Sequence, residues 1–287
     1  LHNAKKANSG IVNIVGQHTL SHLELESPLT SDIEGIARPV SHWVKTSVSS
    51  ENISKDGAEA IYIASNDPGK IATLILPADT AWGKASNIVS AEKPMPRKKV
   101  NKDNIVKTAK ILTNGKNSTL VLGGKALNEK CTELAGKIAA KTGCGIITEA
   151  ANSRLSRGEG RVQMLRIPGA GVVDKAIKML DKAGQLVLVG SKPPVAFFGY
   201  PNKPSLLYKK GTPIYTLVET EEDIYSALVD LVYELNATNF KSAYIAEYNR
   251  PQLPKGTITK ENLAKVIGAL LEENTIVVDE SVTTGRD

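Results

Sequence analysis

Short apolar runs rich in Val, Ile and Leu alternate along this chain with segments whose apolar residues recur at helical spacing. The runs include IVNIV at 11–15, ATLIL at 72–76 and STLVL at 118–122. Strands that are buried on both faces of a parallel sheet have this composition, because helices cover both sides of the sheet. The alternation therefore predicts an α/β protein with doubly wound parallel sheets.

Two connections divide the 287 residues into three folded stretches. The first carries Pro94, Pro96 and a run of positive charge, and the second carries Pro251, Pro254 and Gly256, which is typical of linkers. The sequence thus predicts a first α/β domain, a linker, a central domain, a second linker and the start of a third domain, over 1–85, 86–102, 103–235, 236–256 and 257–287.

The central stretch holds a full set of alternating strands and helices, so we expect a complete Rossmann-like domain there. Its first helix is expected to begin at Asp103 or Asn104, which are good N-cap residues. Further helices are predicted at 126–141, 172–182 and 221–235, and strands at 118–122, 143–150, 185–189 and 212–219. In the terminal stretch we expect a helix over 259–274 and a buried strand from Thr275 to Val278.

Charge and cysteine content limit the classes of function. The formal charge is +6 and the pI is about 9.1, but lysines are scattered, aromatics make up only 5% and no nucleic-acid motif is present, so we expect no nucleic-acid partner. The two cysteines, Cys131 and Cys144, lie in stretches that are typical of buried elements, which argues against a disulfide framework and fits a reducing cytoplasm. No apolar run approaches the roughly 20 residues that span a bilayer, so we expect no membrane segment.

Two histidines follow the first predicted strand. His18 comes directly after Gly16 and Gln17, where a parallel sheet presents side chains at its carboxyl edge. His18 and His22 have the spacing that zinc sites use on a helix, but no third ligand and no general base accompany them. We therefore predict a structural or surface role for His22 and a role in the site for His18.

Two other stretches suggest ligand contacts. Gly123 and Gly124 follow a strand as in a dinucleotide turn, but the third glycine and the later acidic residue are missing, and a tight turn alone explains both glycines. In the terminal DESVTTG, the hydroxyls of Ser281, Thr283 and Thr284 can bind an anion together with nearby backbone amides. An ordinary polar turn is the alternative for this last stretch.

Six stretches together resemble the thiamine diphosphate-dependent enzymes related to acetolactate synthase and benzoylformate decarboxylase. Their order and spacing match that family, and the resemblance covers nearly the whole chain. The stretches are LHNAKKANSGIVNIVGQH, SPLTSDIEGIARPVSHWVKTS, ATLILPADTAW, EANSRLSRGEGRV, GSKPPVAFFGYPNKPS and TIVVDESVTTG.

The resemblance implies three α/β domains. On that map, 1–85 is the C-terminal half of a pyrimidine-binding domain, 103–235 is the central domain, and 257–287 is the start of a diphosphate-binding domain. The family's catalytic glutamate then lies upstream of Leu1, and its Gly-Asp-Gly magnesium motif lies downstream of Asp287. We therefore expect a fragment that is inactive alone, from a parent enzyme that binds thiamine diphosphate and Mg²⁺.

The resemblance also implies roles for particular residues. By this resemblance, Gln17 and His18 are expected to orient the substrate or to transfer protons. Four further residues are expected to contact the diphosphate of the cofactor, namely Glu280, Ser281, Thr283 and Thr284. No residue is assigned to a metal.

The implied reaction is decarboxylation of a 2-oxo acid such as pyruvate, followed by carboligation or by protonation of the enamine. The implied assembly is a homodimer or a tetramer. The central stretch shows no convincing flavin pattern, which makes FAD doubtful. A different class of function stays open, namely a non-catalytic nucleotide-binding or regulatory protein built on the central domain.

Overall fold

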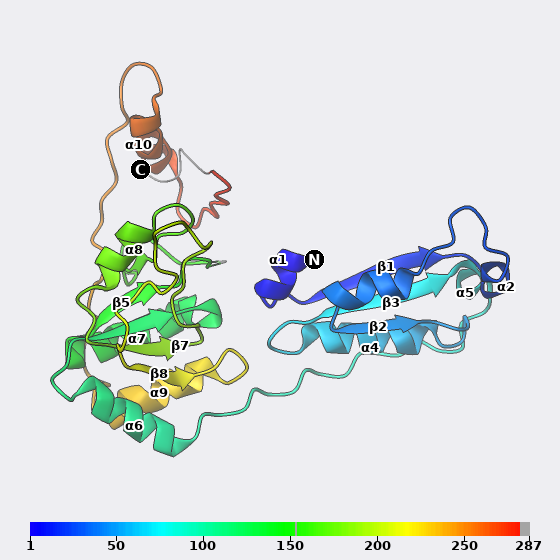
Figure 1. Ribbon diagram of the computed structural model, residues 1–287, viewed down its shortest axis with the longest axis horizontal. Helices are drawn as coiled ribbons and strands as arrows, with labels where there is room; N and C mark the ends of the chain where they lie inside the picture. Colours follow the sequence, from blue (N-terminus) through cyan, green and yellow to red (C-terminus); the bar gives the residue numbers. More distant parts are fainter. Residues whose placement is uncertain (153, 282–287) are drawn as a thin grey trace.

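The computed structural model describes residues 1–152 and 154–281. They form two lobes, one around a three-stranded sheet and one around a five-stranded sheet (Figure 1). The described residues 83–101 connect the lobes without helix or strand, apart from one bridge between Lys98 and Glu222. α10 (Lys260–Leu270) follows the last connection and lies at one end of the second lobe (Figure 1).

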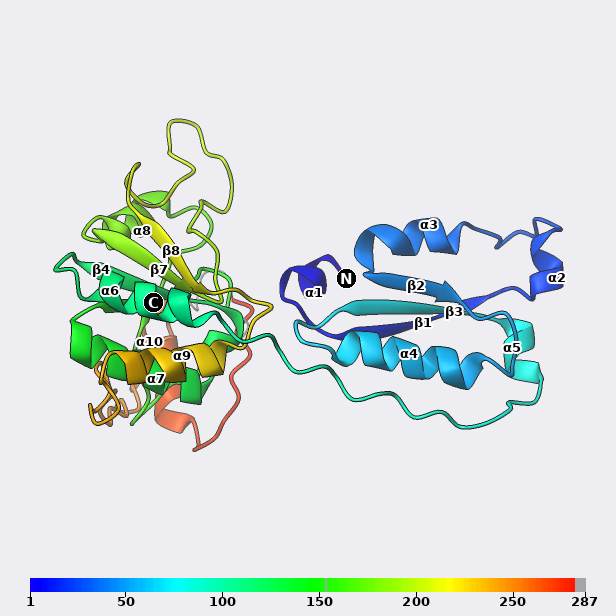
Figure 2. The same cartoon turned by 90° about the horizontal axis from the view of Figure 1, so that it is seen from below.

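The first sheet has the strand order β1-β3-β2, and all of its pairs are parallel. The middle strand is buried because helices α4 and α3 lie on its two faces (Figure 2), and Ile71, Leu74 and Ile75 are no more than 2% exposed. The bounds are β1 (Ile11–Gln17), β2 (Trp43–Thr46), β3 (Ile71–Pro77), α3 (Ile33–Ala37) and α4 (Ile53–Ser65). Shorter helices are α1 (His2–Lys6), α2 (Leu20–Leu23), η1 (Arg38–Val40) and α5 (Ala78–Trp82).

The sequence analysis missed β2, which has only four residues and contains a lysine. Lys45 Nζ lies 2.8 Å from Asp56 Oδ1 and 2.8 Å from Glu59 Oε2, both on α4. These hydrogen bonds raise the pKa of Lys45, the one to Asp56 most, and they outweigh the effect of burial. The strand tolerates a charge at this position because α4 supplies the opposite charges.

The central sheet has the strand order β6-β5-β4-β7-β8, with all pairs parallel. Leu120 and Leu122 of β4 pack in one apolar cluster with residues of α6, α7 and α9, whereas Val121 packs in a second cluster with residues of α8. This confirms the doubly wound parallel fold. The bounds are β4 (Ser118–Leu122), β5 (Gly145–Thr148), β6 (Leu165–Arg166), β7 (Gln185–Val189), β8 (Ile214–Val218), α6 (Lys102–Leu112), η2 (Gly124–Leu127), α7 (Glu129–Thr142), α8 (Val173–Leu180) and α9 (Ile224–Glu234).

Most predicted elements are confirmed, and the differences have local causes. Asn101 caps α6, because its side chain accepts from the Asp103 N–H, so neither Asp103 nor Asn104 is the N-cap. The strand predicted at Thr275–Val278 is wrong, since none of the described strands pairs with it and Ile276 and Val278 are 84% and 80% exposed. An apolar run becomes a strand only where a neighbour completes its hydrogen bonds. None of the described helices is both long and apolar enough to cross a bilayer.

The two lobes are joined by ion pairs around Asp67, in the turn before β3. Arg97 of the connecting segment lies 2.6 Å from Asp67 Oδ1, and Lys125 of η2 donates to Asp67 Oδ2. Arg97 also donates to the Glu222 carbonyl at 3.0 Å, and its side chain is only 13% exposed. Burial opposes ionisation of Asp67, but the hydrogen bonds from Arg97 and Lys125 prevail and lower its pKa.

We predict that Asp67→Asn loosens the contact between the lobes, because the two cations lose their shared carboxylate. Small-angle scattering should show a larger radius of gyration, and trypsin should cleave the 93–99 segment faster. In the wild-type protein the contact persists above the ordinary Asp pKa of 3.8 and is lost as the pH falls through the lowered value.

Asp181→Asn is the matched control, since it removes the pair between Asp181 and Lys209 (2.9 Å) within the second lobe. If the scattering profile of Asp67→Asn equals that of wild type, other contacts hold the lobes together.

Candidate functional site

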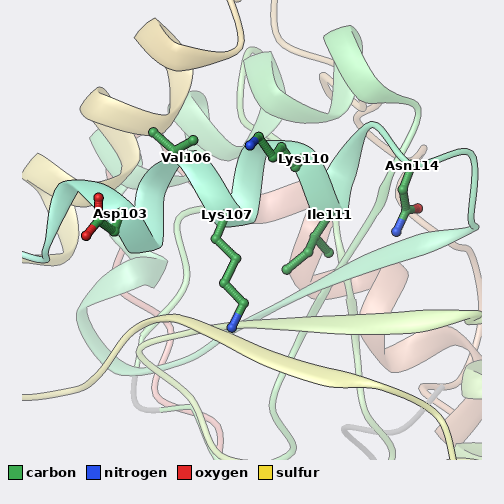
Figure 3. Close-up of a pocket in the computed structure, with 6 residues that line it drawn as sticks. All are labelled: Asp103, Val106, Lys107, Lys110, Ile111 and Asn114. Atoms are coloured by element: carbon green, nitrogen blue, oxygen red, sulfur yellow. The ribbon is translucent and has the colours of Figure 1, made fainter.

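A shallow hollow of about 460 Å³ follows one face of α6 (Figure 3). All of its lining residues come from α6 and the turn after it, namely Asp103, Val106, Lys107, Lys110, Ile111 and Asn114. A hollow built on one helix brings no groups from separate strands together. The carboxyl edges of the two parallel sheets are better candidates, because successive strands deliver side chains to the same edge there.

At the carboxyl edge of the first sheet, Gln17 ends β1 and His18 follows it. Gln17 Oε1 accepts a hydrogen bond from the His18 N–H at 2.8 Å. His18 Nε2 lies 3.2 Å from Ser27 Oγ, which lies 3.2 Å from Thr30 Oγ1. The imidazole of His18 is therefore oriented by a chain of hydroxyls from the loop after α2.

The sequence analysis missed Asp79 at this edge. Asp79 belongs to α5, directly after β3, and its carboxylate accepts from the Leu20 N–H at 3.2 Å. It thereby holds the start of α2 against the end of the sheet. The signal was visible in PADTAW, where an acid is the third residue after the predicted strand.

His22 lies beside His18, with ring centroids 5.3 Å apart and planes tilted by 50°. Among the described residues, no group of three or more His, Cys, Asp or Glu side chains could hold a metal ion. His22 lies on α2 and His18 lies in the connection before it, and the described chain offers the two histidines no third ligand.

The terminal segment does not contact the carboxyl edge of the first sheet. Ser281 donates to Asp279 Oδ1 through both its N–H (2.9 Å) and its hydroxyl (2.5 Å), and these bonds lower the pKa of Asp279. Glu280 is exposed. Thr283 and Thr284 lie outside the described residues. Figure 1 shows the segment after α10 beside the second lobe, whereas the end of β1 points away from that lobe.

The carboxyl edge of the central sheet holds a second polar group. Glu149 follows β5, and its Oε1 accepts from the Gly124 N–H at 3.1 Å. A Cβ on Gly123 would lie 2.7 Å from the Glu149 carboxyl group, so a larger residue at this position would displace that carboxyl group. Burial raises the pKa of Glu149, whereas the Gly124 N–H and the charge of Lys192 act in the opposite direction.

Neither cysteine suits nucleophilic chemistry. Cys131 and Cys144 are both described, buried and free of disulfides, as the sequence indicated. Burial raises the pKa of both thiols, that of Cys144 to about 11. The reactive thiolate is therefore scarce at neutral pH.

No protein-family model matches the chain. The protein named "Putative acetolactate synthase large subunit IlvX" from Mycobacterium tuberculosis is 36% identical over 287 residues, which is 99% of this chain and 54% of that protein. The chain therefore spans about half the length of this curated relative.

Solved structures share the fold. A thiamine diphosphate-dependent 4-hydroxybenzoylformate decarboxylase from Rhodococcus jostii RHA1 has a TM-score of 0.73 and 17% identity, over 96% of this chain and 55% of that one. Benzoylformate decarboxylase from Polynucleobacter necessarius has a TM-score of 0.64 and 19% identity, over 88% of this chain and 49% of that one. At these identities the likeness shows the fold alone.

We predict that Glu149→Gln stabilises the protein more at pH 7 than at pH 4. The raised pKa of Glu149 means that its contribution to the free energy of unfolding is largest below the ordinary value of 4.5 and is lost as the pH rises through the folded value. Glutamine keeps an acceptor for the Gly124 N–H but carries no buried charge. Urea unfolding of both proteins between pH 4 and pH 7 measures the difference.

Glu159→Gln serves as the control, because Glu159 is exposed in the same loop. A difference between Glu149→Gln and wild type that does not change with pH would show that Glu149 carries no buried charge.

Proposed function

We propose that the whole protein is a thiamine diphosphate-dependent enzyme of the acetolactate synthase type that acts on a 2-oxo acid. The proposal is supported by 36% identity to a protein named as a putative acetolactate synthase large subunit and by a fold shared with a thiamine diphosphate-dependent decarboxylase. The observation that carries the proposal is the polar edge at Gln17 and His18. An amide and an imidazole leave the end of β1 there, which is a half-buried edge strand rather than the fully buried strand that its sequence predicts, and the imidazole is oriented by Ser27.

These residues fit the substrate end of a bound thiamine diphosphate. Bound there, the cofactor supplies the electron sink that cleavage of the carbon–carbon bond beside a carbonyl requires. Magnesium does not fit the described residues, because they hold no donor set for a metal ion.

We assign proton transfer to His18. Its Nε2 lies within hydrogen-bond distance of Ser27 Oγ (3.2 Å), so the imidazole can exchange a proton along the hydroxyl chain to Thr30. Gln17 is assigned to substrate positioning, for which its amide must turn away from the His18 N–H. Its N–H groups then donate to the carboxylate of the 2-oxo acid.

The domain map, the assembly and the location stay part of the proposal. We propose that 1–85 and 257–287 belong to cofactor-binding domains and that Glu280, Ser281, Thr283 and Thr284 contact the diphosphate, for which the Ser281 hydroxyl must leave Asp279. A homodimer or tetramer is supported by exposed apolar side chains on the first lobe, among them Ile14, Ile36 and Trp82. Buried free thiols support a cytoplasmic location.

Nucleotide binding by the central domain is the second candidate. The crevice at the carboxyl ends of β4 and β7 is the switch point of the sheet, where such folds bind ligands, and Gly124 and Gly190 take positive φ there. Against it, the Gly124 N–H already binds the Glu149 carboxylate, whose charge repels a phosphate. We therefore rank nucleotide binding below the 2-oxo acid reaction.

The test is carbon dioxide release from a panel of 2-oxo acids by the full-length protein with thiamine diphosphate and Mg²⁺. We expect His18→Ala to lower kcat/KM by about 100-fold, the usual loss of a positioned proton-transfer group. His22→Ala is the matched control and should change kcat/KM by less than about threefold, because His22 lies beside His18 but its ring has no hydrogen-bond partner among the described residues.

Two results would reject the proposal. One is the absence of carbon dioxide release from every acid in the panel, and the other is equal activity of the two histidine variants. For residues 1–287 alone we expect calorimetry to detect no binding of thiamine diphosphate with Mg²⁺ and no binding of ADP. Binding of ADP at micromolar concentration would favour nucleotide binding by the central domain.

A further inference from the structure

A cavity of about 760 Å³ opens at the amino edge of the central sheet. Its lining includes Asn117 before β4, Gly145 at the start of β5 and Ala183 before β7. Gly124 and Glu149 lie at the other end of these strands. The cavity is therefore separate from both carboxyl edges described above.

The cavity exists because β6 is short. β6 pairs with β5 only from Ile147 onwards, and the residues before β6 turn away to pair with a later segment. There Val162 forms a bridge with Ile245, and the Gln163 N–H donates to the Tyr244 carbonyl at 2.7 Å. The first half of β5 is thus left beside a gap.

A side-chain hydrogen bond fixes the far wall of the gap. Tyr244 Oη donates to the Cys144 carbonyl at 3.2 Å, directly before β5. This bond ties the 244–246 segment to the start of β5, so the opening is part of the folded lobe.

The lining combines an apolar floor with a cationic rim. The floor includes Ile146, Leu155, Met164 and Met179, and the rim is formed by three cations, namely Arg157, Arg161 and Lys182. None of the described residues that line the cavity is acidic.

The three cations differ in whether they form an ion pair with an acidic side chain. Arg161 Nε lies 3.4 Å from Glu129 Oε2, whereas Arg157 and Lys182 have no ion-pair partner among the described residues. Two positive charges at the mouth of the cavity thus lack a counter-charge from the described chain.

We propose that this cavity binds a small apolar monocarboxylate. Its volume lies in the range of about 300 to 1,000 Å³ that is typical of small-molecule sites. The carboxylate meets Arg157 and Lys182 at the rim, and the hydrocarbon or aromatic body covers the apolar floor. Met164 and Met179 adapt to bodies of different shape, because methionine side chains are unbranched and flexible.

The methionines also provide the test. The chain has three, of which Met164 and Met179 line the cavity and Met95 lies exposed in the segment between the lobes. In protein labelled with ¹³C at the methionine methyl groups, titration with octanoate should shift the signals of Met164 and Met179 saturably. The signal of Met95 should stay in place, and octylammonium, of equal length and opposite charge, should cause no saturable shift.

Variants that remove the positive charges of the rim test whether those charges bind the carboxylate. Arg157→Gln with Lys182→Gln should weaken octanoate binding about tenfold or more, the usual effect of losing hydrogen bonds to a charged group. Lys55→Gln with Lys93→Gln removes the same charge at exposed positions outside the cavity and should leave the affinity unchanged.

Three outcomes would overturn the proposal. They are unchanged signals of Met164 and Met179 with octanoate, an equal response to octylammonium, and an equal shift of all three methionines. None of these measurements depends on thiamine diphosphate, so the result is independent of the proposed reaction.

Discussion

Parallel pairing of strands that are buried on both faces is the constraint on which both lobes depend. Such strands bond to neighbours on both sides and must be covered above and below by helices, so β3, β4 and β7 are rich in Ile, Leu and Val. Parallel order also sends every strand end to one edge. The polar groups of each lobe gather at such edges, with His18 and Asp79 in the first lobe and Glu149 in the second.

The sequence predicted those elements whose pattern is strong within a short window. The long apolar runs of β3 and β7 and the amphipathic helices α7 and α9 needed no knowledge of their neighbours. Elements that depend on contacts with residues far away in the sequence were not predicted. β2 contains Lys45, whose charge is met by α4, and β6 has only two residues. Thr275–Val278 has the composition of a strand without a described neighbour.

The candidate site follows the same division. His18 could be placed because it directly follows a strand, and sequence order alone fixes that position. Its orientation could not be predicted, because it rests on Ser27 and Thr30 in a loop. The contact of Glu149 with Gly124 spans 25 residues and arises only when β4 and β5 pair. The cavity at the amino edge was equally invisible, since it results from the point at which β6 leaves β5.

The ion pairs of Asp67 lie at the amino edge of the first sheet, and His18 lies at the carboxyl edge of the same sheet. The seven residues of β1 separate these edges by about 23 Å, at roughly 3.3 Å per residue. Asp67 therefore holds the first sheet at the edge opposite to His18. A rotation of this sheet by about 10° around Asp67 would displace His18 by about 4 Å, so small changes at these ion pairs would be magnified at the far edge.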